Sequence, residues 1–223
     1  MGTEKRRSRE KARRAETIVD AAEKVILEKG FEAATMDEIA ESAELSKGAL
    51  YLYFRSKAEL YLAICLRGSN ELNSRFAAVL ASRNSGLEMI RKMGEEYLDF
   101  VKNKPLYFRA FSYYESIQDF EFLQESGYAE LCEKNSSQAL TYMSRALQAG
   151  MQDGTIDNRY DPMELALVIW SSSRGIVQMA FLKHSSPHRN ILNEVEIDIQ
   201  SMFGSYIEIL SNGMSAESKK RID

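Results

Sequence analysis

The chain has 223 residues and a net charge of −4, and its 44% apolar and 28% charged residues are proportions of a folded globular protein, which excludes a disordered chain. Helical spacing in almost every segment, with only three prolines, predicts an all-α fold. The longest apolar run, Leu165 to Trp170, is far shorter than the roughly 20 residues that cross a bilayer, so we expect no membrane span.

The charge is distributed unevenly along the chain. Residues 1–14 hold seven Lys and Arg against Glu4 and Glu10, so this segment carries +5 and the remainder carries −9. Such a separation predicts a basic arm that faces a polyanion and an acidic body that faces elsewhere. A basic tail that is merely solvated explains the charge alone equally well.

The N-terminal segment has no apolar core and no small-residue cleavage site, so we expect no export and a cytoplasmic protein. Cys65 and Cys132 lie in mostly apolar helical contexts, and we expect them to be reduced and buried.

The first predicted helix covers about 10–29, with Ile18, Ala22, Val25 and Ile26 on one stripe, and Gly30 ends it. Three helix starts then follow within about 20 residues. They are a capping box at Thr35–Glu38, an N-cap at Ser46 and a second capping box at Ser56–Glu59. Short helices at 36–43 and 47–54, joined by a tight turn, have the dimensions of a helix-turn-helix.

Longer helices are predicted beyond this point, at about 58–81, 85–103, from Pro105 onward, 119–150, 162–183 and 191–211, with a loop at 184–190. We divide the chain into an N-terminal domain at 1–60, which contains the helix-turn-helix, and a C-terminal domain at 61–223. The boundary falls inside a helix, which allows a displacement in one domain to reach the other.

The faces of the segment 47–54 suggest what it contacts. At about 100° per residue, Leu50 and Phe54 face the core, whereas Gly48 and Leu52 point outward. Tyr51 and Tyr53 flank the outward face, and Lys47 lies in the first turn. The major groove of DNA would satisfy these groups. Lysine reaches guanine or phosphate, leucine contacts a thymine methyl group, tyrosines bind phosphates, and the backbone N–H groups at Ser46 and Lys57 favour phosphate. Packing of the tyrosines against neighbouring helices is the alternative.

The stretch "TMDEIAESAELSKGALYLYFRSKAEL", residues 35–60, resembles the DNA-binding signature of the TetR family of bacterial transcriptional regulators. The resemblance covers about 15–62 and implies an all-helical homodimer with an N-terminal helix-turn-helix and a larger ligand-responsive domain. The resemblance also implies which residues contact DNA. Together with the faces of the segment 47–54, it gives the predicted DNA contacts Thr35, Ser46, Lys47, Gly48, Tyr51, Leu52, Tyr53 and Lys57. One departure is Glu44, which stands where the family often has a glycine in a left-handed conformation.

In the C-terminal domain, the segment 106–122 holds seven of the 22 aromatic residues. Such rings with a few hydroxyl groups suit a pocket for an apolar or aromatic effector, although plain helical core is the alternative. The residues that we assign to this pocket are Phe108, Phe111, Tyr114, Trp170 and Arg174. Arg174 lies in an otherwise apolar helix and needs a partner, which Glu115, the dimer seam or an anionic ligand could provide.

The helices at 162–183 and 191–211 are amphipathic and suit an intersubunit four-helix bundle, as the family resemblance also implies. His184 and His188 are the only histidines, and Pro187 places them in a loop, which argues against a metal site. No catalytic triad, phosphate-binding loop or dinucleotide fingerprint is present, so we expect neither an enzyme nor a cofactor.

These observations predict a dimeric transcriptional regulator, most simply a repressor that a small, largely apolar effector releases from its operator. Two other classes remain open. One is a ligand-binding protein whose helix-turn-helix contacts proteins, and the other is a generic DNA-packaging protein.

Overall fold

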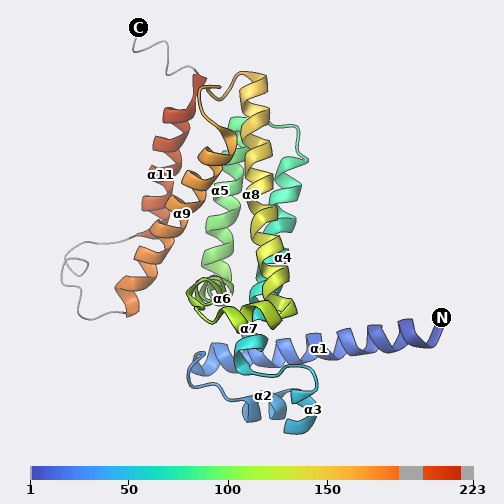
Figure 1. The fold of residues 1–223 in the computed structure, drawn as a ribbon. Helices are drawn as coiled ribbons and strands as arrows, with labels where there is room; N and C mark the ends of the chain where they lie inside the picture. The colour runs from blue at the N-terminus through green and yellow to red at the C-terminus, as the bar shows by residue number, and fades with distance from the viewer. Residues whose placement is uncertain (1, 186–197, 217–223) are drawn as a thin grey trace. The chain divides into compact units, whose positions relative to one another are not determined.

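The computed structural model describes residues 2–185 and 198–216. The secondary-structure elements within these ranges are α-helices (Figure 1), which confirms the all-α prediction. Contacts divide the chain into two compact units. Unit 1 comprises residues 1–69 and 105–134, and unit 2 comprises 70–104 and 135–223. Unit 1 therefore holds more than the N-terminal 60 residues. Across the described ranges, no helix combines the length and the apolar character needed to cross a membrane.

Unit 1 begins with α1 (Gly2–Lys29), which is eight residues longer at its N-terminus than predicted. Its first turns are rich in Glu, Lys and Arg, which propagate a helix well without any apolar stripe to reveal it. The helix ends where Gly30 adopts φ 84° and donates its N–H to the Ile26 carbonyl at 2.8 Å. Ile18 and Ala22 are fully buried and hold α1 to the rest of the unit.

The helix-turn-helix consists of α2 (Met36–Ser42) and α3 (Lys47–Tyr51). The Thr35–Glu38 capping box and the Ser46 N-cap are both present, as predicted. α3 is shorter than the predicted 47–54, because its last turn tightens: the N–H groups of Leu52 and Tyr53 donate to the carbonyls three residues earlier. The turn between the helices contains Glu44 at φ 55°, so this residue does adopt the left-handed conformation that glycine usually fills.

Unit 1 also contains the start of α4 (Lys57–Leu80), α6 (Pro105–Ser116), α7 (Phe120–Glu125) and the start of α8 (Gly127–Asp153). The single helix predicted at 119–150 is wrong, because the chain breaks at Ser126. The backbone of Ser126 is extended, and its hydroxyl accepts the N–H of Ala129 at 3.4 Å. This serine therefore ends α7 and caps α8.

Unit 2 combines α5 (Gly86–Asn103), α9 (Pro162–Ser185) and α11 (Ile199–Met214) with the remainders of α4 and α8. α11 packs against α5 and α9, and these helices run side by side in Figure 1. Gly86 starts α5 directly against α8, where an added Cβ would lie 2.0 Å from the Gly150 nitrogen. The Asp153 carboxylate accepts the Gly86 N–H at 2.8 Å and fixes this crossing.

Two predicted boundaries in unit 2 differ from the structure. α9 continues to Ser185, so His184 and Ser185 are helical and the prediction of a loop at these two residues is wrong. Most of that loop, including His188, and residues 191–197 of the last predicted helix lie outside the described residues. α11 starts at Ile199, after the Asp198 side chain caps it, and continues to Met214.

Candidate nucleic-acid interface and apolar cavity

The two faces of α3 differ sharply in exposure. Leu50 and Phe54 are fully buried, whereas Leu52 is 79% exposed and Tyr51 is 42% exposed. Gly48 lies on the exposed side, where the surface is open. Tyr53 is half-buried beside this face. The inward and outward positions predicted from helical spacing are confirmed, and the outward face presents a leucine and a tyrosine ring to solvent.

Lys47 is held at the edge of this face by an ion pair. Its ammonium group lies 2.8 Å from a carboxylate oxygen of Asp37, on α2. Hydrogen bonding to Asp37 raises the pKa of Lys47, so the side chain stays cationic at physiological pH. Both partners are exposed, so a stronger anion would compete for this lysine with little desolvation cost.

The hydroxyl groups of Thr35 and Ser46 cap helices and remain exposed. Thr35 Oγ1 accepts the Glu38 N–H at 3.3 Å and donates to the Glu38 carboxylate at 3.0 Å. Ser46 Oγ accepts the Ala49 N–H at 3.2 Å. The Ser46 hydroxyl only accepts in its cap, so its proton can be donated to a phosphate, whereas the Thr35 hydroxyl must release the Glu38 carboxylate to do so.

Glu38 is the centre of a small polar cluster at the start of α2. Lys29 donates to its carboxylate at 2.6 Å, and the Thr35 backbone N–H donates at 3.0 Å. These bonds, first that from Lys29, lower the pKa of Glu38 to about 2. The carboxylate therefore fastens the end of α1 to the start of α2.

The side chain of Lys57 lies in the connection between α1 and α2. Its ammonium group donates to the carbonyls of Phe31, Glu32 and Ala34 at 2.7, 3.0 and 3.1 Å. It also lies 4.7 Å from the centre of the Phe31 ring. All three of its protons thus have protein acceptors, and its principal role in this structure is to fix the connection that positions α2.

Three aromatic rings extend this anchoring through unit 1. Phe31 stacks on Tyr61 at 4.1 Å between ring centres, and Tyr113 packs against both rings. Burial raises the pKa of Tyr61 to about 12, which keeps its hydroxyl neutral. The connection between α1 and α2 is therefore packed onto α4 and α6 within one unit.

The aromatic segment predicted to line an effector pocket belongs largely to this same unit. Phe108 is buried, and Phe111 and Tyr114 are half-buried, all three on α6. None of them lines the apolar cavity found in unit 2.

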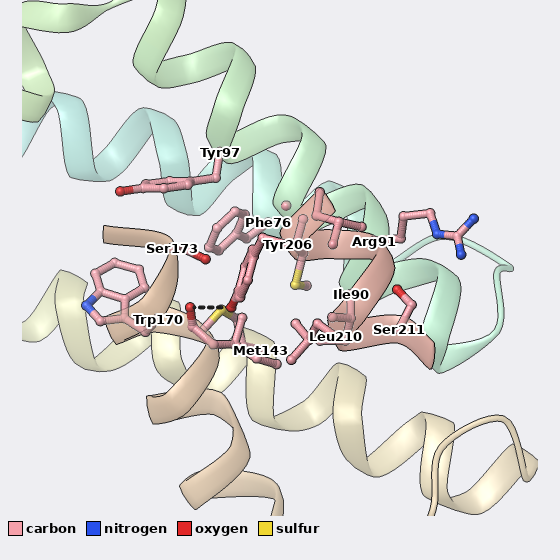
Figure 2. Close-up of a pocket in the computed structure, with 14 residues that line it drawn as sticks. Phe76, Ile90, Arg91, Tyr97, Met143, Trp170, Ser173, Tyr206, Leu210 and Ser211 are labelled. Carbon is pink, nitrogen blue, oxygen red and sulfur yellow. Dashed lines mark hydrogen bonds between the residues drawn. The ribbon is translucent and has the colours of Figure 1, made fainter. Parts of the chain in front are cut away.

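That cavity has a volume of about 30 Å³ and is shown in Figure 2. Its wall includes Phe76 of α4, Tyr97 of α5, Met143 of α8, Trp170 of α9 and Tyr206 of α11. Five helices thus meet around a space that holds one or two water-sized molecules. Of the predicted pocket residues, Trp170 is the one that lines it.

A few polar groups interrupt the apolar wall. The Tyr206 hydroxyl donates to the Ile169 carbonyl at 3.0 Å, and Ser173 lies beside it (Figure 2). Burial raises the pKa of Tyr97 well above its usual value. Arg174, half-buried next along α9, has its pKa lowered by desolvation, with Tyr97 nearby acting in the opposite direction. An apolar wall with the hydroxyl groups of Tyr97, Ser173, Tyr206 and Ser211 suits a mainly hydrophobic molecule that carries a polar end.

Known regulatory proteins share sequence with this chain, above all in the helix-turn-helix region. Residues 18–64 match the family model described as bacterial regulatory proteins, tetR family. The transcriptional activator FasR of Mycolicibacterium smegmatis is 37% identical over 91 residues, which are 41% of this chain and 41% of that relative. The transcriptional repressor KstR of Rhodococcus jostii is 26% identical over 207 residues, which cover 92% of this chain and 89% of that protein.

A solved structure extends the likeness to the whole fold. The transcriptional regulator FadR of Bacillus subtilis, in complex with stearoyl-CoA, superposes with a TM-score of 0.68 at 18% identity. The match covers 89% of this chain and 98% of that one. At 18% identity the superposition establishes the shared fold alone. The family match rests on the sequence of residues 18–64. The helix-turn-helix region of the chain, residues 18–64, is that of the TetR family of bacterial regulatory proteins.

Proposed function

We propose that the chain is a cytoplasmic, ligand-controlled, dimeric repressor that inserts α3 into the major groove of operator DNA. The observation that carries the proposal is the exposure of Leu52 and Tyr51 on a helix whose other face is fully buried. Burying a leucine side chain is worth roughly 1.5–3 kcal/mol, so the exposed Leu52 beside Tyr51 forgoes a stabilisation that a binding partner would restore. A thymine methyl group and the adjoining backbone would cover them.

The remaining contacts follow from the positions around this face. Lys47 would exchange the Asp37 carboxylate for a guanine or a phosphate, and Gly48 would allow the backbone to approach closely. Tyr51, Tyr53 and Ser46 would donate hydroxyl hydrogen bonds to phosphates. Thr35 would do so by exchanging the Glu38 carboxylate for a phosphate. For Lys57 we assign an indirect contribution, because its ammonium group holds the α1–α2 connection.

The dimer would form through α9 and α11, as expected for the segments 162–183 and 191–211. Large apolar side chains are exposed on both helices: Leu167 is 46%, Val168 55% and Ile209 72% exposed. A second copy would cover this face symmetrically. Val168→Asp with Ile209→Asp should therefore give a monomer in sedimentation velocity, whereas Leu131→Asp, at an exposed leucine in unit 1, should leave the dimer intact.

The effector would enter the cavity of unit 2. The present volume is too small for any effector larger than a few atoms, so binding must displace flexible side chains such as Met143 and separate the helices around them. A solved transcriptional regulator of the same fold is in complex with stearoyl-CoA, which supports a long-chain acyl compound as the class of ligand. Because α4 and α8 contribute to both units, their displacement would alter the separation of the two α3 helices in the dimer.

Effector binding can be measured directly, because Trp170 is the only tryptophan in the chain and lines the cavity. Titration with stearoyl-CoA should change its fluorescence. Ser173→Leu, which fills the cavity, should abolish the change, and Ser171→Leu, on the exposed side of the same helix, should not. A response that survives Ser173→Leu would place the ligand elsewhere.

The DNA function is tested by gel retardation of the gene's own upstream region with excess random DNA present. The proposal requires a retarded complex that Leu52→Ala with Tyr51→Ala removes and that the bound effector weakens. Equal retardation of random DNA would favour a packaging protein. No retardation would favour a helix-turn-helix that contacts proteins, and a complex that the effector strengthens would overturn release by the ligand.

A further inference from the structure

The side chains of residues 4–14 of α1 are all exposed, and they include seven of the 29 lysines and arginines of the chain. Figure 1 shows α1 as one continuous helix whose N-terminal turns extend past α2 and α3. This extension lies outside the family match, which begins at residue 18. It is therefore a feature of this chain in addition to its helix-turn-helix.

The charges of the extension do not stabilise the helix that carries them. Cations near a helix N-terminus are opposed by the helix dipole, and a helix without packed side chains is marginal in water. Like charges on neighbouring turns also repel one another. An anionic partner bound along the extension would offset the dipole, the lack of packing and the repulsion between like charges. A tail that is merely solvated leaves these three costs uncompensated.

The direction of the basic side chains is fixed by the helix itself. At about 100° per residue, Arg7, Lys11 and Arg14 continue the stripe that holds the buried residues Ile18, Ala22 and Val25. The buried stripe packs towards the helix-turn-helix, and α1 contacts α2. The three cations therefore point to the same side of α1 as the helix-turn-helix.

A groove joins these cations to the end of the recognition helix. Its walls are formed by Tyr53, just after α3, and by residues of α1 that include Arg7, Lys11, Arg13 and Arg14. Glu10 is the single carboxylate in that wall. Tyr53 thus lies both in the groove and next in sequence to Tyr51 and Leu52, and the groove has the charge that a phosphate backbone requires.

We propose that the α1 extension is a second DNA contact, in which Arg7, Lys11 and Arg14 bind phosphates of the duplex flanking the base pairs that α3 reads. The proposal rests on the proposed DNA-binding function. Residues 4–14 span roughly 16 Å at 1.5 Å per residue, which corresponds to about five base pairs. The contact is sequence-independent, so it raises affinity and on-rate without changing the preferred operator.

The test compares two triple variants that remove the same charge from the same helix. The groove variant carries Arg7→Gln, Lys11→Gln and Arg14→Gln, which remove three cations that line the groove. The control variant carries Lys5→Gln, Arg6→Gln and Arg9→Gln, which remove three exposed cations that do not line it. All six residues are exposed, so neither variant should alter folding, and circular dichroism checks this. The probe is a fluorescent 40-base-pair duplex of random sequence, and anisotropy gives its affinity across a series of KCl concentrations.

For the groove variant, the slope of log affinity against log salt should fall by about 2–3 per chain, with a loss of at least tenfold in affinity near 0.1 M salt. The control variant should keep most of the slope. Equal losses in the two variants would show a diffuse charge effect and overturn the groove contact, as would no loss in either. If the wild-type protein does not bind the duplex, or binds vesicles containing phosphatidylserine more tightly than the duplex, the proposed DNA function is overturned as well.

Discussion

The ammonium group of Lys47 lies 2.8 Å from the carboxylate of Asp37, so the cation best placed to reach DNA is already paired across the two helices of the helix-turn-helix. The pair is exposed, and its breakage costs little. The carboxylate nevertheless competes with the phosphate or guanine that Lys47 would contact, and it carries a negative charge beside the DNA.

Replacing Asp37 with asparagine should therefore strengthen DNA binding. We expect affinity for a duplex to rise about twofold to fivefold, the range of one exposed ion pair, and the salt slope to steepen by about one per chain. Glu41→Gln removes the same charge from the exposed side of α2 and should have a smaller effect. If both substitutions act equally, only the net charge matters and Lys47 is not the residue released.

Lys57 separates a structural role from a DNA contact. Lys57→Ala removes three hydrogen bonds from the α1–α2 connection, so the free energy of unfolding should fall by about 1–3 kcal/mol. The salt slope of DNA binding should change less than it does for Lys47→Ala. Urea denaturation and anisotropy report the two quantities separately. Unchanged stability with a slope lower by one would instead make Lys57 a direct phosphate ligand.

Glu44 occupies a left-handed position at φ 55° in the turn between α2 and α3. Glu44→Gly should raise the free energy of unfolding by up to about 1 kcal/mol, because glycine adopts this conformation without steric cost. Glu44→Ala removes the carboxylate and keeps the strain, so it should not stabilise the protein. Both variants should bind DNA more tightly than the wild type, since each removes a negative charge from the turn. Equal stability of the two variants would contradict the role of backbone strain.

The pKa of Glu38 predicts how stability depends on pH. It is lowered from 4.5 to about 2 in the folded protein, first by Lys29 and then by Thr35. The ionised carboxylate therefore stabilises the fold above pH 4.5, and this contribution is lost as the pH falls from about 4.5 to about 2.

Glu38→Gln keeps a capping side chain but cannot titrate. The wild type should be more stable than this variant at pH 6, and the difference should shrink steadily towards pH 3 in urea denaturation. A difference that stays constant across this range would show that the Lys29 interaction does not depend on the charge of Glu38.

Local signals in the sequence were sufficient for the helix-turn-helix. Capping residues and helical spacing predicted α2, the start of α3 and the opposite exposures of Leu50 and Leu52, because these depend on residues within one or two turns. The length of α1 was missed because a helix without an apolar stripe has no periodic signal, and the break at Ser126 because one serine weighs little against a long helical pattern.

The cavity shows where such reasoning ends. Trp170 was identified, but Tyr97, Ser173 and Tyr206 were not, because each lies on a different stretch of helix with no shared motif. The aromatic segment 106–122 was the strongest pocket signal in the sequence, yet within unit 1 its Phe108 is buried and its Tyr113 packs against Phe31 and Tyr61. Local density of aromatic residues did not reveal which helices pack around a common space.

The central claim is that two copies of α3, related by the symmetry of a dimer, enter successive major grooves. Selection of bound duplexes from a random library tests it most directly. The account predicts an enriched inverted repeat whose half-sites are centred about 10 base pairs apart or a multiple of this distance, and loss of the enrichment with Leu52→Ala and Tyr51→Ala. Enrichment of no sequence, or of a motif without two-fold symmetry, would contradict it.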